Sequence, residues 1–546
     1  MLKKGYWRSS AELWPEPLRA PSSLAVTTEA REIEPQEEPR SVQPHEEDED
    51  AGGNTGIASL VLHTRSAKAR VSKPLARGAG AVLTASLLAA CAVGPDYHEP
   101  KVATPDQFVS AEGVQSSGAE VERDFWISFH DETLNGLIEE ALHANHDIRI
   151  AMTHLREARA IHGEARLDFA PTVTASGSRV ETRLSERQQP FPGIDRDQSY
   201  YDASFDAFWE LDLFGRVRRN YEAQSALVQA AEAGLYDTQV SVTAETARNY
   251  FELRGSQQRL EVARRNAENQ AESLRITQAR LDAGRGTQLD VSRAQAQLSS
   301  TLATIPDLEA AVTRSILRLG VLTGHEPDSL LSRLNATQAL PALPETYSIG
   351  TPESLLRRRP DIRVAERQLA AATAAIGVAV GDLFPRISFV GRWGYDAVSS
   401  GDLGHAGTES FSFGPSIQWA AFDLGRVRQH IHQREAAADG ALAQYQKAVL
   451  QALEETDASL TDYAKARVKQ QHLQSSATAS ADAARLARAR FDSGVADFLT
   501  VLDAERTMLE AEDQLAKSQT QTATALLAMY KALGGGFRPL DRAASR

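Results

Sequence analysis

The chain has 546 residues, with 59 Lys and Arg against 73 Asp and Glu, and a formal net charge of −14. This length suffices for several domains. The acidic balance and the lack of a basic stripe argue against nucleic acid as a partner. The sequence also contains no apolar run of about 18 residues, the length of a membrane-spanning helix.

The N-terminal segment, residues 1-67, is acidic and contains prolines, most densely between Glu32 and Asp50. It shows no apolar periodicity, so we expect it to be disordered. Because an export signal belongs at an N-terminus, we further expect this extension to be a start-site artefact, with translation beginning near Val71. A peptide covering Glu32 to Arg40 in cells would contradict this interpretation.

Residues 68-90 have the pattern of a signal peptide, in which basic residues precede a short apolar stretch. The basic residues are Lys68, Arg70, Lys73 and Arg77. The stretch ends in Leu-Ala-Ala-Cys, which resembles the lipobox of bacterial lipoproteins. This resemblance implies cleavage between Ala90 and Cys91, lipidation of Cys91, and a lipidated N-terminal segment over 91-124. A lone buried cysteine is the alternative, but this one follows an export signal.

Three segments alternate apolar and polar residues, which predicts β-strands between two different environments. A fourth segment, after Pro171, alternates more weakly and is predicted partly by analogy with its repeat partner. Tyr201, Phe205 and Trp209 share one parity, while Asp202 and Asp206 share the other. Strands of about this length cross a bilayer when tilted, with aromatic residues near their ends. A soluble sandwich with one wet face would alternate in the same way. The strands are expected at about residues 171-184, 199-213, 385-397 and 409-422.

A long segment poor in proline follows each strand pair and predicts a very long helix, a turn and a second helix. The helices are expected at residues 216-283, 287-323, 426-493 and 497-533. The first would be about 100 Å long at ~1.5 Å per residue. Residues spaced by seven form a coiled-coil seam: Leu253, Leu260, Ala267, Leu274 and Leu281. The polar remaining faces favour helices around a wet lumen, with a plain antiparallel coiled-coil hairpin as the alternative.

The chain contains the same unit twice. Asp147-Ile148-Arg149 recurs as Asp361-Ile362-Arg363, 214 positions later, and Trp209 recurs as Trp419, 210 positions later. A period this long indicates a tandem duplication rather than a solenoid. It predicts a first repeat over 125-324, a linker over 325-352, a second repeat over 353-534 and a C-terminal tail over 535-546.

A glycine follows each of the two longest predicted helices. Glycine readily adopts the left-handed conformation that closes a helix. We therefore expect hairpin tips at Gly284-Arg285 and at Gly494-Val495.

Several motifs in this order resemble one family. They are the lipobox, Val93-Gly94-Pro95-Asp96-Tyr97, the duplicated strand and helix unit, and the segment from Tyr530 to Phe537. Together they resemble the outer-membrane efflux lipoproteins, the NodT/OprM branch of the TolC-like outer-membrane factors. The resemblance implies a mixed α and β fold, with a trimeric 12-stranded outer-membrane β-barrel continued by a periplasmic α-helical barrel. Residues 325-352 would then form an equatorial linker.

The resemblance also implies a function. The protein would be the outer-membrane channel of a tripartite efflux system, a passive gated duct that exports drugs or other toxic small molecules from the periplasm. Its implied partners are two further copies of the chain in a homotrimer, a periplasmic adaptor (membrane fusion) protein docked on the tips, an inner-membrane RND-type pump and outer-membrane lipid. A duct for type I protein secretion or metal efflux, and a structural coiled-coil lipoprotein, remain open alternatives. We expect no enzyme activity, cofactor or metal site, because no such motif is present.

Just past the second tip, the resemblance implies two stacked constrictions that close the tunnel at rest. Leu499 would form a hydrophobic ring and Asp503 an anionic ring, each repeated three times. Arg506 lies one helical turn beyond Asp503 and can pair with it. A ring of acids would favour cations at the narrowest point, whereas a solvated helix face is the alternative interpretation of these charges.

The first repeat supplies the equivalent positions Asp290 and Arg293, which correspond to Thr500 and Asp503. The TolC branch carries an acid where Thr500 stands, so the resemblance does not extend to a doubled acid ring. The expected gate is therefore Asp290, Arg293, Leu499, Thr500, Asp503 and Arg506.

Overall fold

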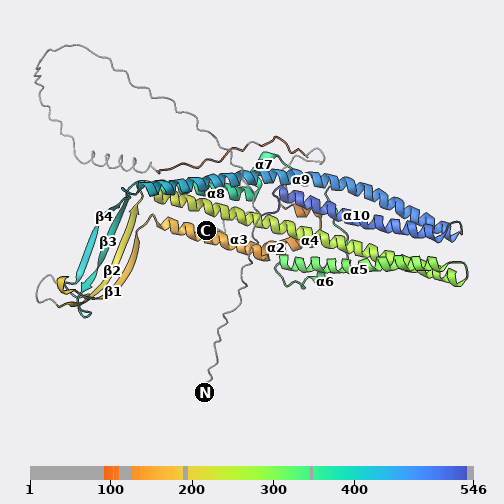
Figure 1. Cartoon of the computed structure of the whole chain (residues 1–546), viewed down its shortest axis with the longest axis horizontal. Coiled ribbons are helices and arrows are strands. Elements are labelled where there is room, and N and C mark those ends of the chain that lie inside the picture. Colours follow the sequence, from red (N-terminus) through yellow and green to blue (C-terminus); the bar gives the residue numbers. More distant parts are fainter. Residues whose placement is uncertain (1–91, 103, 110–123, 189–194, 345–347, 538–546) are drawn as a thin grey trace, which may run out of the picture. The chain divides into compact units, whose positions relative to one another are not determined.

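The computed structural model describes residues 92–102, 104–109, 124–188, 195–344 and 348–537. The expected extension over 1-67, the signal peptide over 68-90 and the lipidated Cys91 lie outside these ranges. Most of the expected C-terminal tail also lies outside them. Within the described residues, long helices accompany one four-stranded sheet (Figure 1).

The two halves of the chain share one order of main elements, a helix, two strands and two long helices, and differ in their short helices. The first half contains η2 (Phe125–Phe129), α2 (Glu132–Ala144), α3 (His146–Leu167), β1 (Thr172–Arg183), η3 (Glu186–Gln188), β2 (Asp197–Leu211), α4 (Arg216–Asp282) and α5 (Gln288–Leu322). The second contains α6 (Leu331–Leu334), α7 (Pro352–Arg358), α8 (Pro360–Gly381), β3 (Arg386–Ala397), β4 (Glu409–Gln418), α9 (Leu424–Asp492) and α10 (Phe498–Ala532). The four strands and four long helices thus lie close to their predicted positions.

The sheet is antiparallel, in the order β1-β2-β3-β4. The β2–β3 pair joins the two repeats, with Tyr201 opposite Ala397. Strands β1 and β4 form the two edges. β4 ends at Gln418, four residues before its predicted end at 422, because the chain then turns, with the amide of Asp423 donating to the carbonyl of Ala420 at 2.9 Å.

Over β2, β3 and β4, one face of the sheet is apolar and open to its surroundings, whereas β1 adds the exposed charges of Arg179, Glu181 and Arg183 to that face. Phe205 stacks on Trp393, with ring centroids 6.3 Å apart, and both rings are exposed. Phe411 is 71% exposed and Phe413 is also exposed. An exposed apolar surface of this kind requires an apolar environment or a partner. A soluble sandwich would bury this face under a second sheet, and the described residues form only one sheet.

The main hydrophobic core lies where short helices cover the middle of the long ones. Phe125 of η2 stacks on Tyr530 of α10, with centroids 4.7 Å apart, and Phe129 contacts Phe251 of α4. Arg254 is fully buried beside them and donates to the carbonyl of Ala336 at 3.1 Å. This core joins both repeats to the linker between them.

The long helices form two hairpins, α4 with α5 and α9 with α10, and α4 also packs against α10. Along α4, the predicted seam is buried at Leu253, Leu260 and Ala267, and half-buried nearer the turn, at Leu274 and Leu281. Figure 1 shows both hairpin turns at the ends of α4 and α9 remote from the sheet. None of the described helices combines the length and apolar character needed to cross a membrane.

Candidate functional site

The two hairpin turns share one backbone geometry. Gly284 and Gly494 both adopt the left-handed conformation, with φ of 72° and 77°. The amide of Arg285 donates to the carbonyl of Arg280 at 2.8 Å, and that of Val495 to Arg490 at 2.9 Å. These bonds, each spanning five residues, close a Schellman motif. The sequence prediction of a glycine-closed turn at each tip is confirmed.

Both tips are open in the single chain. A Cβ built on Gly284 or Gly494 would meet no heavy atom within 4 Å. Val495 is 67% exposed at the second tip. An exposed apolar side chain next to an uncovered turn can contact a partner without rearrangement.

The helices that leave the tips begin with related caps. Thr287 and Asp290 form a capping box at the start of α5, in which the Thr287 hydroxyl donates to Asp290 Oδ2 at 2.7 Å. At the start of α10 the residue types are exchanged, and the Thr500 hydroxyl donates to Asp497 Oδ1 at 2.6 Å. This hydroxyl, followed by the Thr500 amide, lowers the pKa of the Asp497 carboxyl. Asp290 and Thr500 therefore take part in capping the N-termini of their own helices. Their spacing of three residues from Thr287 and Asp497 could have indicated this role.

Three of the expected gate residues share an exposed face of α10. Leu499 is 49% exposed, and the Asp503 side chain, one turn further on, is 66% exposed. Arg506 donates to Asp503 Oδ1 at 2.8 Å, which confirms the ion pair predicted from their spacing. This hydrogen bond raises the pKa of Arg506. The face therefore presents a leucine directly followed by a partly neutralised carboxylate.

In the first repeat, Arg293 is exposed on α5. Leu289, which was not among the expected gate residues, is 57% exposed and stands 210 positions before Leu499. The repeat offset alone could have identified it. The first repeat thus also presents an exposed leucine just past its tip.

The opposite face of α10 is held by an apolar cluster. Phe491 of α9 packs against Phe498 of α10, with centroids 5.5 Å apart, and Arg280 of α4 lies 4.2 Å above the Phe491 ring. The cluster is completed by Ala294, Ala487, Val501 and Leu502. These contacts fix the rotation of α10 about its axis and so determine which side chains the exposed face presents.

A buried carboxylate links three helices one turn above this cluster. Glu505 of α10 is 7% exposed and accepts from Arg488 of α9 at 3.2 Å and from the hydroxyl of Ser273 of α4 at 3.3 Å. Burial raises the pKa of Glu505, and the Arg488 guanidinium opposes this shift. Sequence reasoning missed this group, because its partners come together only when α4 and α9 both pack against α10.

The motif from Val93 to Tyr97 lies against the start of α4 and against α8. Buried Arg219 donates to the carbonyls of Val93 and Gly94 and forms a 2.6 Å ion pair with Asp96. The Tyr97 hydroxyl donates to Glu366 of α8. We call residues 93–97 the N-terminal strap. It contacts both repeats, directly after the expected lipidation site.

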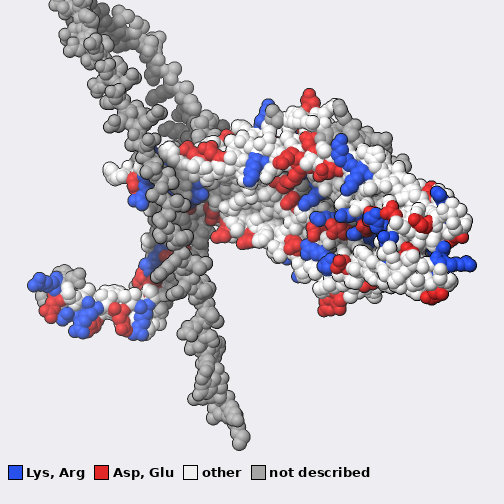
Figure 2. Space-filling view, turned by 45° about the vertical axis from the view of Figure 1, so that its right-hand side comes forward, with Lys and Arg blue, Asp and Glu red and all other residues white. Residues whose placement is uncertain are grey.

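Charges of both signs are interspersed over the helical part of the chain (Figure 2). Many form ion pairs between helices, such as Arg259 with Asp513 at 2.7 Å and Arg264 with Glu309 at 2.6 Å. Among the described residues, no group of three or more His, Cys, Asp or Glu is arranged to hold a metal ion.

Comparison with known proteins gives one consistent result. The family model described as outer membrane efflux protein matches residues 137–325 and 351–535. The solvent efflux pump outer membrane protein SrpC of Pseudomonas putida is 31% identical over 459 residues, covering 83% of this chain and 96% of SrpC. The outer membrane protein OprJ of Pseudomonas aeruginosa is 31% identical over 468 residues, covering 84% and 96%. The solved structure of the outer-membrane channel OprN matches with a TM-score of 0.76 and 42% identity, over 82% of this chain and 99% of OprN.

Proposed function

The chain belongs to the outer membrane efflux protein family, and we propose that three copies of it form a gated duct for small toxic molecules. The expected fold class, family resemblance and outer-membrane location are confirmed by the comparisons. The protein is the outer-membrane channel component of an efflux system. The assembly, the gate, the docking partners and the cargo are the parts that we propose.

The proposed trimer is supported by the four-stranded sheet, which has an exposed apolar face and two edge strands, β1 and β4. Four strands cannot close a barrel, since the smallest transmembrane barrels have about eight and bacterial ones are even-numbered. In our proposal three copies give twelve strands, with the apolar face toward lipid and the polar face toward a water-filled lumen. The long helices continue this lumen into the periplasm.

We place the resting gate at the exposed face of α10 just past the second tip. Leu499 and Asp503 would each occur three times around the axis, and Arg506 would neutralise part of the anionic ring. Asp290 and Thr500 would support this gate as helix caps, and Arg293 with Leu289 would line the first-repeat side. The ion pair and the capping contacts described above support this assignment.

The exposed tips at Gly284-Arg285 and Gly494-Val495 are the proposed docking surface for a periplasmic adaptor protein. The adaptor would connect the duct to an inner-membrane RND-type pump. The chain would be anchored by lipid on Cys91 after cleavage behind Ala90, with residues 1-67 absent from the mature protein. The N-terminal strap supports this anchoring, because it holds the residues that directly follow Cys91 against the junction of strand and helix.

The printed name of SrpC specifies a solvent efflux pump. This relative supports small-molecule efflux over protein secretion as the role of our chain. A passive duct has no substrate pocket to select its cargo, so selection would lie with the pump.

Each chain would supply one third of the barrel. Its two repeats, 125-324 and 353-534, are joined by the linker 325-352, and each repeat would supply half of that third, namely two strands and one helical hairpin.

Single-channel conductance in planar bilayers tests the gate. We expect the double variant Leu499→Ala, Asp503→Ala to conduct more, and to stay open longer, than the unaltered protein. The matched control is Leu486→Ala, Asp482→Ala on α9, which removes an exposed leucine and an aspartate that pairs with an arginine three residues on. Unchanged conductance in the gate variant, or an equal increase in the control, would refute the gate assignment.

A further inference from the structure

The two β-hairpins of one chain are equivalent residue by residue. In the first, Thr172 of β1 lies opposite Phe208 of β2, and in the second, Arg386 of β3 lies opposite Gln418 of β4. Arg386 follows Thr172 by 214 positions, and Gln418 follows Phe208 by 210 positions, the same two offsets that relate the repeats in the sequence. The duplication has therefore preserved register, and not only strand order.

The β2–β3 pair, which we call the intrachain seam of the sheet, shows how one hairpin joins the next. In this seam Asp206 lies opposite Arg392 and Asp202 lies opposite Asp396. If another copy of the chain continues the sheet, its β1 must meet β4 as β3 meets β2. Shifting β2 by 210 positions gives β4, and shifting β3 by 214 positions in the opposite direction gives β1.

A helix glycine independently indicates that this junction is repeated between copies. Gly377 of α8 is closely packed, since a Cβ built there would lie 2.7 Å from Cγ of Arg219 on α4. Its equivalent in the first repeat, Gly163 of α3, has nothing within 4 Å. Helix α8 packs between α4 and α9, whereas the long helix that α3 packs against extensively is α4. The open side of Gly163 is therefore the place where an α9 from another copy would lie.

We propose that β4 of one copy pairs with β1 of the next copy in the register that places Ser416 opposite Ser178. The same register sets Phe411 opposite Arg183 and Gln418 opposite Ser176 of the next copy. The occupant of both sheet edges is thus a second copy of this chain. This inference rests on the proposed trimeric duct, and adds to it the residue-level interface.

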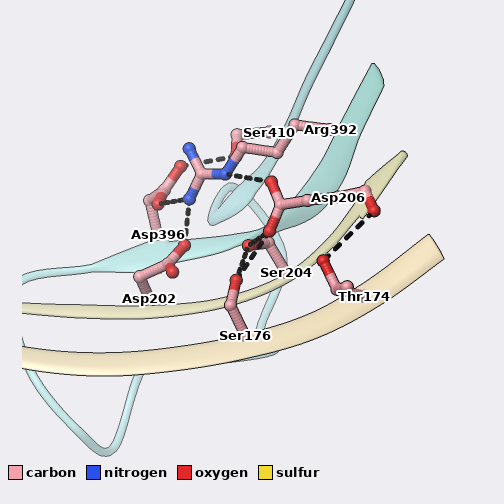
Figure 3. A network of polar contacts seen from close by, with 8 residues as sticks. All are labelled: Thr174, Ser176, Asp202, Ser204, Asp206, Arg392, Asp396 and Ser410. Atoms are coloured by element: carbon pink, nitrogen blue, oxygen red, sulfur yellow. Dashed lines mark hydrogen bonds and ion pairs between the residues drawn. The ribbon is translucent and has the colours of Figure 1, made fainter. Parts of the chain in front are cut away.

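The intrachain seam carries charge on the polar face of the sheet. Arg392 bridges Asp202 and Asp396, with 2.9 Å to Asp396, and approaches Asp206 at 3.9 Å (Figure 3). Ser176 and Ser204 add a direct hydroxyl contact of 2.8 Å across β1 and β2. This network draws its charged members from both repeats of a single chain.

The proposed seam between copies would carry no charge on that face. The equivalents of Asp206 and Arg392 are Ser416 and Ser178, and those of Asp202 and Asp396 are Ser412 and Thr182. Hydroxyl pairs can bond across the strands as Ser176 and Ser204 do, without removing ions from water. Charged and uncharged seams would therefore alternate around the lumen, and the strand pairing between copies would not depend on ion pairs.

Disulfide cross-linking in the full-length protein in outer membranes tests the register. Directly opposed residues of antiparallel strands lie about 4.5–5.5 Å apart at Cα, within the range that a disulfide bridges. We expect Ser178→Cys, Ser416→Cys to give covalent dimers and trimers on oxidised, non-reducing gels. The single variants should give at least tenfold less. Ser176→Cys, Ser204→Cys is the control, and should close within one chain without forming oligomers.

A pair of cysteines shifted by two residues tests the proposed register between copies. Ser176→Cys, Ser416→Cys corresponds to a slip of two residues and should cross-link at least tenfold less than Ser178→Cys, Ser416→Cys. Equal or stronger cross-linking of the shifted pair would overturn the proposed register, as would absence of oligomers while the intrachain control closes. Planar-bilayer conductance of the same preparations separates failure of the proposed register from failure of the proposed duct. If only the register is wrong, the protein still forms a conducting channel. If the proposed duct is wrong, it does not.

Discussion

The indole nitrogen of Trp209 donates a hydrogen bond of 3.1 Å to the backbone carbonyl of Phe169, and so ties the end of β2 to the segment that begins β1. The second repeat makes the same bond, from Trp419 to the carbonyl of Leu383 at 2.9 Å. Both hairpins are thereby fixed at the same point relative to the helices that flank them. Tryptophan suits this place, because its ring is apolar and its N–H needs a partner.

Replacing Trp209 by Phe keeps an aromatic ring and removes the donor. We expect this change to lower stability by about 0.5–1.5 kcal/mol, the net contribution of one such hydrogen bond. The readout is the temperature at which the detergent-resistant oligomer dissociates on gels. Trp209→Ala, which also removes the ring, should lower that temperature further. If Trp209→Phe dissociates at the same temperature as the unaltered protein, the hydrogen bond contributes nothing to stability.

The tip glycines allow a comparison that isolates backbone strain. Gly284→Ala and Gly494→Ala add a methyl group that meets no atom, so their only cost is the left-handed backbone, about 1–2 kcal/mol. Gly440 lies within α9, has equally free space and has no positive φ. Gly440→Ala should therefore stabilise by up to about 1 kcal/mol, through helix propensity. Apparent melting temperatures in detergent check this, and shifts of the same sign in all three variants would contradict the turn geometry.

The buried Glu505 predicts a dependence of tip stability on pH. Because burial raises its pKa above the ordinary 4.5, the folded tip binds this proton more tightly than the unfolded tip does. The stability that protonation contributes is complete below pH 4.5, and is lost as the pH rises through the raised pKa. Among the described residues, Arg488 and Ser273 donate to the carboxylate, and these contacts offset part of this loss.

Glu505→Gln removes this titration and retains a side chain that Ser273 can reach. We expect hydrogen exchange at the start of α10 to become slower relative to the unaltered protein as the pH rises above 4.5. Comparison at each pH cancels the intrinsic pH dependence of exchange. Glu512→Gln, at a half-buried partner of Arg265, is the control and should show no such trend. A pH-independent difference between Glu505→Gln and the unaltered protein would contradict the account.

The N-terminal strap predicts a severe effect at one glycine. Gly94 has a φ of 93°, and a Cβ there would lie 2.4 Å from Cα of Gly377, which is backbone and cannot swing away. We expect Gly94→Ala to detach the strap, so that residues 92–102 become sensitive to protease and fewer oligomers form. Gly401→Ala, in an open loop, should behave like the unaltered protein. Protease resistance of the strap in Gly94→Ala would show that its contacts do not hold it.

The parts of this fold that were predictable are those with local or repeated signals. Alternation predicted β2 and β3, because apolar and polar environments lie on opposite sides of the sheet. The glycines at 284 and 494 predicted both turns. The repeat offset predicted that these features would occur twice, and it also contained the signal for Leu289, which went unnoticed.

Other features depend on contacts between distant segments, which no local pattern encodes. Glu505 resembles any other acid of a solvated helix until α4 and α9 surround it. Arg219 gives no sign in the sequence that it will be buried under the strap. Asp290 was interpreted as a gate residue by position in the repeat, while its spacing from Thr287 already indicated a helix cap.

The central claim, that this protein is an export duct, is tested most directly by the accumulation of a fluorescent dye and of antibiotics in cells. A strain without this gene is compared with the same strain carrying it on a plasmid. The account predicts that accumulation rises in the deletion strain and returns to the original level on complementation. Unchanged accumulation of every compound in both strains would contradict it.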